Sequence, residues 1–182
     1  ALLMATSRGF LRQRVALPGT IAEVIADVNR QLIRDVADSA SFMTMFFLQI
    51  DPGGRAVSWV RAGHDPALIY DPATDIFSEL GGAGTALGVN PDAVYQQYRQ
   101  ADLSAGQGIV LGTDGIWEAH SPEGEMFGKN RLEGLIARYH QAGARDIMLA
   151  ILSELDNFQQ GQPAEDDITV IVIKISDPSN HD

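Results

Sequence analysis

Two short acidic segments, each next to an apolar run, hold the residues of this sequence best suited to chemistry. Asp114 lies within residues 112–115 (GTDG), directly after one apolar run, while Asp166 and Asp167 directly precede the apolar run 168–175 (ITVIVIKI). Both runs are predicted to be buried strands. A carboxylate at the end of such a strand is held in place while its oxygens stay free, and Mg²⁺ and Mn²⁺ prefer oxygen ligands. The two segments therefore predict a site for a divalent cation.

A purely structural interpretation of these acids remains open. Asp-Gly is a favoured turn pair, and aspartate often begins or caps an element. Two like charges about 4 Å apart repel by about 1 kcal/mol in water, or about 4 kcal/mol at an effective dielectric of 20, and a bound cation would relieve this repulsion. Glu118, four residues after Asp114, would orient a metal-bound water or would simply be an exposed acid.

The overall composition narrows the class of protein. The 182 residues include no cysteine, carry a net charge of −11, and are 45% hydrophobic and 20% charged. This is the composition of one soluble globular domain, with no apolar run of the roughly 20 residues that cross a bilayer. The acidic balance argues against nucleic acid as a partner. Without cysteine, disulfides, thiolate metal sites and a cysteine-nucleophile phosphatase mechanism are excluded, and a cytoplasmic location is expected.

The remaining pattern predicts the elements that must position the acids. Helices are expected at 1–13, 21–37, 129–140 and 144–158, and strands at 42–50, 55–62, 67–70, 96–99, 108–112 and 168–175. Thr20 and Glu23 form a predicted capping box. Six apolar residues recur at helical spacing after it: Ile21, Val24, Ile25, Val28, Leu32 and Val36. The order of elements predicts an α+β fold with helices on mostly antiparallel sheet.

Other candidate residues receive structural interpretations. His64 is interpreted as a turn residue, because no second histidine lies at metal-ligand spacing. His120 and His140 are expected at the surface, and Trp117 in the core. Residues 81–84 (GGAG) lack the Lys-Ser/Thr pair of a phosphate-binding loop, which argues against nucleotide binding.

Five motifs occur in an order and at spacings that resemble those of the SpoIIE/RsbU-type serine/threonine phosphatases. These enzymes are bacterial relatives of the type 2C metal-dependent phosphatases. They are residues 29–47, 62–66 (AGHDP), 111–119 (LGTDGIWEA), 125–128 (EMFG) and 166–169 (DDIT). The resemblance extends over nearly the whole chain. It implies an αββα sandwich of mostly antiparallel sheets flanked by helices, with two Mn²⁺ or Mg²⁺ ions in the complete domain.

The resemblance also assigns roles to the acids. Asp114 and Asp166 would be catalytic metal ligands, and Asp167 would occupy the following metal-site position, although the adjacent acids could exchange roles. The family's first metal aspartate lies in an Asp-x-x-Gly-His-Gly segment ahead of a helix beginning like residues 1–5. The chain is therefore expected to lack that aspartate and the first strands, to bind metal poorly, and to turn over weakly or not at all. Residues 1–176 would be this phosphatase domain, and 177–182 a polar tail.

The implied function is hydrolysis of phosphoserine or phosphothreonine on a bacterial signalling protein in stress response and sigma-factor regulation. The implied substrate is a phosphorylated STAS-type anti-sigma-factor antagonist. An upstream sensor or receiver domain would act through the two N-terminal helices. A homodimer is a possible assembly, and neither nucleic acid nor a membrane is expected as a partner. The alternatives are a catalytically inactive phosphatase-like binding module in the same pathway, and a partner-binding α+β domain whose acidic turns are structural.

Overall fold

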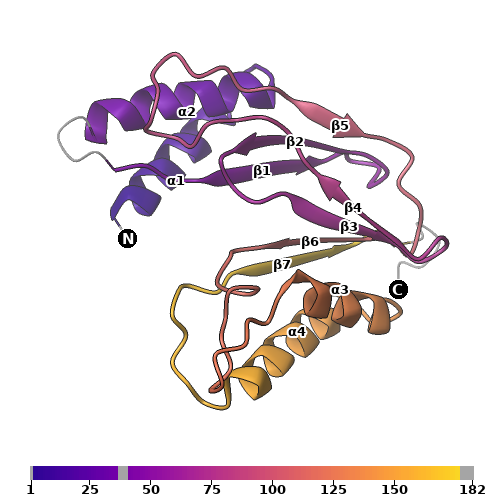
Figure 1. Cartoon of the computed structure of the whole chain (residues 1–182). Helices are drawn as coiled ribbons and strands as arrows, with labels where there is room; N and C mark the ends of the chain where they lie inside the picture. Colours follow the sequence, from indigo (N-terminus) through magenta and orange to yellow (C-terminus); the bar gives the residue numbers. More distant parts are fainter. Residues whose placement is uncertain (1, 37–40, 177–182) are drawn as a thin grey trace. The chain divides into compact units, whose positions relative to one another are not determined.

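The computed structural model describes residues 2–36 and 41–176, which form two compact units interleaved along the chain (Figure 1). Unit 1 comprises Ala1–Pro66 and Gly81–Asp102, and unit 2 comprises Ala67–Leu80 and Leu103–Asp182. Each unit contains two helices and one antiparallel sheet. The predicted α+β class is thereby confirmed, while the expected polar tail at 177–182 lies outside the described residues.

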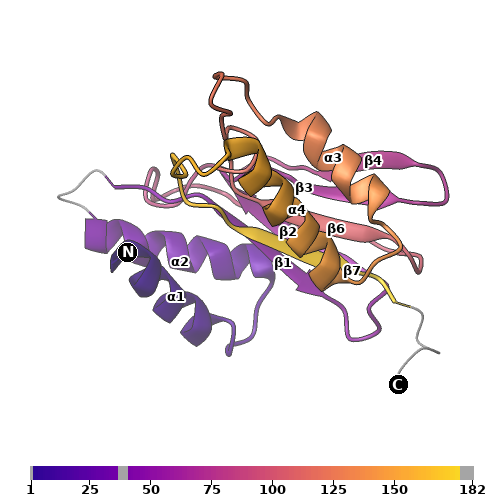
Figure 2. The same ribbon diagram turned by 90° about the horizontal axis from the view of Figure 1, so that it is seen from below.

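Unit 1 places a helix pair beside a three-stranded sheet. Its elements are α1 (Leu2–Arg14), α2 (Ile21–Val36), β1 (Met45–Ile50), β2 (Val57–Ala62) and β5 (Tyr98–Gln100), and the strand order is β1-β2-β5. Figure 2 shows α1 and α2 side by side. The first strand begins three residues later than predicted, because Phe42 is 63% exposed and Met43 forms only an isolated bridge to Leu87.

The start of α2 is the one predicted from the capping box. The Thr20 hydroxyl accepts a hydrogen bond from the Glu23 amide at 3.2 Å, and the Glu23 carboxylate accepts one from the Thr20 amide at 2.7 Å. These two bonds satisfy amides that would otherwise lack partners at the beginning of the helix. Five of the six residues of the predicted apolar face are buried, and the side chain of Val36 lies outside the described set.

Unit 2 is a four-stranded sheet with two helices. Its elements are β3 (Ala67–Asp71), β4 (Ile76–Leu80), β6 (Gly108–Gly112), α3 (Lys129–Arg138), α4 (Ala144–Gln159) and β7 (Val170–Lys174), and the strand order is β4-β3-β6-β7. Figure 2 shows α3 and α4 covering one face of this sheet. The core of the unit is formed by residues of the sheet, of both helices and of the segment between β6 and α3, among them Val110, Ile116, Phe127, Leu132, Ile147, Ile151 and Leu155.

Two strand predictions in unit 2 are corrected. The strand β4 was not predicted, because its residues are mostly exposed and carry only a short apolar signal. The last strand begins at Val170 rather than at residue 168, and it is an edge strand rather than a buried one, with Ile171 51% exposed.

No helix in the described part of the chain is both long enough and apolar enough to cross a membrane.

Candidate functional site

The pairing of β6 with β7 brings the two acidic segments to one end of the sheet of unit 2. The ladder ends with Gly112 opposite Val170, and beyond it the amide of Thr113 donates to the carbonyl oxygen of Thr169 at 3.1 Å. Because the strands are antiparallel, the chain leaving β6 and the chain entering β7 are neighbours at this end. Residues 113–115 and 166–169, more than 50 positions apart in the sequence, therefore lie side by side.

A glycine lets the two segments touch. The chain turns after Thr113, with the Glu118 amide donating to the carbonyl oxygen of Asp114 at 2.8 Å. Gly115 is buried in this turn, and a Cβ atom placed on it would lie 2.8 Å from the Asp167 carbonyl oxygen and 3.5 Å from that of Asp166. Only glycine at position 115 lets the backbone of the turn come this close to the Asp167 carbonyl oxygen. The backbone of the turn carrying Asp114 is thus in direct contact with the backbone of the other two acids.

The three carboxylates are exposed and only locally bonded. One oxygen of Asp114 accepts the Gly115 amide at 3.1 Å, and one oxygen of Asp166 accepts the Asp167 amide at 2.7 Å. Across residues 2–36 and 41–176, the second oxygen of each, and both carboxylate oxygens of Asp167, have no hydrogen-bond or ion-pair partner. No lysine or arginine among residues 2–36 and 41–176 forms an ion pair with these carboxylates, so the negative charge on the two touching segments would attract a cation.

A histidine contact adjoins the same loop. Nδ1 of His120 is buried and lies 3.3 Å from a carboxylate oxygen of Glu165, in the contact geometry of an ion pair rather than of a directed hydrogen bond. His120, which was predicted at the surface, is partly exposed: 35% of its side chain is accessible, while Nδ1 is covered. The contact joins the residue directly before Asp166 to the segment that follows the Asp114 turn.

The other candidates mostly keep structural roles. His64 lies in a bend after Gly63, as predicted, with Nδ1 3.2 Å from the Thr44 hydroxyl. His140 is half-buried rather than at the surface, because its ring contacts Tyr70 edge-on.

Trp117 and Glu118 follow the Asp114 turn. Trp117 is half-buried and packs on the core of unit 2, with the Lys129 ammonium 4.8 Å from its ring centroid. Glu118 is exposed, so both of its interpretations remain open.

The donor set suits a hard divalent cation, although it is incomplete. Carboxylate oxygens are the ligands that Mg²⁺ and Mn²⁺ prefer. In the described part of the chain, no group of three or more histidine, cysteine, aspartate or glutamate side chains is arranged to hold a metal ion. The two segments therefore offer a partial ligand shell, which water or further ligands would have to complete.

Sequence reasoning missed Thr113. Its hydroxyl donates to the Asp167 carbonyl oxygen at 2.9 Å and accepts a hydrogen bond from the Thr169 amide at 2.9 Å. The available signal was the position of Thr113, a residue with a hydroxyl group, between the end of a predicted strand and the candidate ligand Asp114. It could not be read without knowing that β7 pairs with β6.

Comparison with known proteins gives a consistent result. A family model described as Stage II sporulation protein E (SpoIIE) matches residues 1–176. Phosphoserine phosphatase RsbU of Bacillus subtilis (strain 168) is 29% identical over 153 residues, which is 84% of this chain and 44% of that protein. The chain thus spans less than half the length of this relative.

Two solved structures share the fold. The SiaA-PP2C domain of Pseudomonas aeruginosa superposes with a TM-score of 0.81 at 22% identity, covering 96% of this chain and 69% of that one. The phosphatase domain of the cell fate determinant SpoIIE from Bacillus subtilis, presoaked with Mn, gives a TM-score of 0.59 at 17% identity, covering 93% of this chain and 73% of that one.

Proposed function

Because this chain belongs to the SpoIIE family, as its motifs predicted, we propose that its full-length gene product is a metal-dependent protein phosphatase acting on phosphoserine or phosphothreonine. The observation that carries the proposal is the backbone contact between Gly115 and the carbonyls of Asp166 and Asp167. It gathers unpaired carboxylates on two touching segments. An acidic site of this kind would repel a phosphate dianion, so phosphate chemistry there requires cations to neutralise it first.

The residues of the site have distinct tasks in this proposal. Asp114 and Asp166 would hold Mn²⁺ or Mg²⁺, two ions in the complete domain, through the oxygens that their local hydrogen bonds leave free, and Asp167 would add a further carboxylate. The bonds to the Gly115 and Asp167 amides restrict the rotation of the two ligand side chains. When bound, divalent ions supply an activated water molecule and neutralise charge on the transferring phosphoryl group.

The biological setting is part of the same proposal. The relative RsbU is named a phosphoserine phosphatase, and the SpoIIE phosphatase domain was presoaked with Mn. By analogy, the proposed substrate is a phosphorylated STAS-type regulatory protein in a cytoplasmic signalling cascade. An upstream sensor or receiver domain would control activity through α1 and α2, and the active species would be a monomer or a homodimer.

The proposal is tested by phosphate release from a phosphoserine peptide, using the full-length gene product with Mn²⁺ and with EDTA. We expect release with Mn²⁺ that EDTA abolishes. Asp114→Asn should lower kcat by about 10²–10³-fold, as loss of a single group that stabilises transition-state charge does, while the circular dichroism spectrum stays unchanged. Asp156→Asn, an exposed position in α4 of the same unit, is the matched control and should keep full activity.

Two results would overturn this assignment. Phosphate release that persists in EDTA would exclude a metal-dependent reaction. Near-normal release by the Asp114→Asn variant would remove that residue from the site. Binding of the phosphopeptide without hydrolysis at any Mn²⁺ concentration would instead support the phosphatase-like binding module.

A further inference from the structure

Thr113 makes three hydrogen bonds across the two acidic segments, more than any other residue of the site. Its amide donates to the Thr169 carbonyl oxygen at 3.1 Å, its hydroxyl accepts from the Thr169 amide at 2.9 Å, and its hydroxyl donates to the Asp167 carbonyl oxygen at 2.9 Å. A threonine hydroxyl has one proton to donate and two lone pairs. Its donor capacity is therefore fully used, and both of its bonds end on the loop that carries the acids.

The hydroxyl takes the place of a backbone group. In a regular antiparallel pair, the Thr169 amide would donate to the Thr113 carbonyl oxygen. Here that carbonyl oxygen accepts the Ile116 amide at 3.1 Å instead, because the chain turns toward Asp114. The hydroxyl accepts the Thr169 amide in its stead, so the pairing of the two chains continues for one more step while the turn begins.

The second hydroxyl bond reaches beyond the ladder to the acids themselves. By holding the Asp167 carbonyl, Thr113 fixes the loop at the position where the Gly115 backbone touches it. Together with the β6–β7 ladder and the close approach at Gly115, the Thr113 hydroxyl thus ties the turn carrying Asp114 to the loop carrying Asp166 and Asp167. We infer that Thr113 is a positioning residue of this site, which holds the three acids in register without itself contacting substrate.

This role is separable from fold stability. Both hydroxyl bonds are exposed to solvent, so water can satisfy the Thr169 amide and the Asp167 carbonyl when the hydroxyl is removed. Thr113→Val keeps the branched shape and loses both bonds, whereas Thr113→Ser keeps the hydroxyl and loses a methyl group. Thr74→Val removes an exposed hydroxyl from the β3–β4 turn of the same unit and serves as the matched control.

The test measures Mn²⁺ affinity by calorimetry, kcat and KM on a phosphoserine peptide, and hydrogen exchange of the Thr169 amide, in the full-length gene product. For Thr113→Val we expect Mn²⁺ affinity and kcat to fall by about 10- to 100-fold, as for other residues that orient metal ligands, with KM changed less than about twofold. The Thr169 amide should exchange faster. Thr113→Ser should restore all of these values to within about threefold, and Thr74→Val should change none of them.

The outcomes distinguish this inference from the proposed function on which it rests. If wild-type protein binds Mn²⁺ and turns over, and Thr113→Val does both equally well, then the positioning role is wrong while the phosphatase stands. If wild-type protein neither binds Mn²⁺ nor turns over, the proposed function fails. In that case the exchange of the Thr169 amide still decides whether the hydroxyl holds the loop, and equal exchange in wild-type protein and Thr113→Val would refute it.

Discussion

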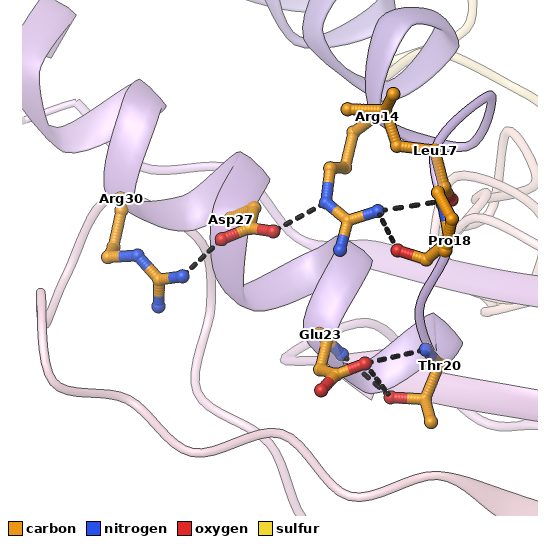
Figure 3. A network of polar contacts seen from close by, with 7 residues as sticks. All are labelled: Arg14, Leu17, Pro18, Thr20, Glu23, Asp27 and Arg30. Atoms are coloured by element: carbon orange, nitrogen blue, oxygen red, sulfur yellow. Dashed lines mark hydrogen bonds and ion pairs between the residues drawn. The ribbon is translucent and has the colours of Figure 1, made fainter.

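Arg14, the last residue of α1, forms an ion pair with Asp27 in α2 (Figure 3). Its guanidinium also donates hydrogen bonds to the carbonyl oxygens of Leu17 at 3.3 Å and Pro18 at 3.1 Å, in the turn between the two helices. Arg30 pairs with the other carboxylate oxygen of Asp27. One planar, multiply donating side chain thus joins both helices and their connection.

Replacing that side chain by lysine tests its geometry. Arg14→Lys keeps the charge but cannot make all of these bonds at once, so the free energy of unfolding should fall by about 1 kcal/mol. Arg8→Lys, at an exposed position of the same helix, should leave it unchanged. Urea unfolding of wild-type protein, Arg14→Lys and Arg8→Lys measures these free energies. Equal midpoints for wild-type protein and Arg14→Lys would show that the positive charge alone accounts for the contribution of Arg14 to stability.

The pair also predicts a dependence on pH. The Arg14 hydrogen bond holds the pKa of Asp27 below its ordinary value of 3.8. A carboxyl with a lowered folded-state pKa stabilises the fold above the unfolded value and loses that contribution as the pH falls through the folded one. Wild-type protein should therefore exceed Asp27→Asn in stability at pH 7, by a margin that shrinks below pH 3.8. A margin that is constant from pH 7 to pH 3 would contradict the assignment.

The buried hydroxyl of Tyr95 in unit 1 is predicted to lower the free energy of unfolding relative to phenylalanine at the same position. Tyr95 is 5% exposed, its hydroxyl has no hydrogen-bond partner among the described residues, and burial raises its pKa to about 12. Tyr95→Phe should raise the free energy of unfolding by about 1 kcal/mol, because the unfolded chain alone hydrates the hydroxyl.

Tyr98→Phe is the matched comparison for this tyrosine. The Tyr98 hydroxyl accepts the Ala83 amide at 3.0 Å and donates to Gln96 at 3.1 Å. Because both bonds are exposed and water can replace them, this second change should lower the free energy of unfolding only slightly. Thermal or urea unfolding that moves both variants in the same direction would show that hydroxyl partners do not decide the outcome.

Glycine at position 115 is predicted to matter for the site more than for the fold. In Gly115→Ala the new methyl group meets the Asp167 carbonyl oxygen at 2.8 Å, so the exposed loop must move away. Mn²⁺ affinity should fall, with a loss of about 1 kcal/mol in unfolding free energy. Gly134→Ala in α3, where the methyl meets nothing within 4 Å, should gain about 1 kcal/mol. If calorimetry finds the same Mn²⁺ affinity in Gly115→Ala as in wild-type protein, the close approach of Gly115 to the Asp167 carbonyl is not required for metal binding.

Local patterns predicted what local physics determines. Thr20 and Glu23 cap α2 because both partners lie within one turn, and the buried face of that helix follows from spacing alone. The approach of the segment carrying Asp114 to the segment carrying Asp166 depends on the pairing of β6 with β7, and no local pattern specifies which strands pair. The resemblance to a family implied the shared site. The hydroxyl bonds of Thr113 became visible only once the register was known.

Because acidic side chains are gathered at the site, Mn²⁺ should reverse the order of stability of wild-type protein and the Asp167→Asn variant. In EDTA, Asp167→Asn should unfold at a higher temperature than wild-type protein, because it removes one of two adjacent unbalanced charges. With millimolar Mn²⁺, wild-type protein should become the more stable, since a ligand that binds only the folded state stabilises it in proportion to its affinity. Asp156→Asn, at an exposed position of α4 outside the two acidic segments, should shift with wild-type protein in both buffers. Melting curves that show the same Mn²⁺-induced shift in wild-type and Asp167→Asn proteins would mean that this carboxylate takes no part in holding the ion.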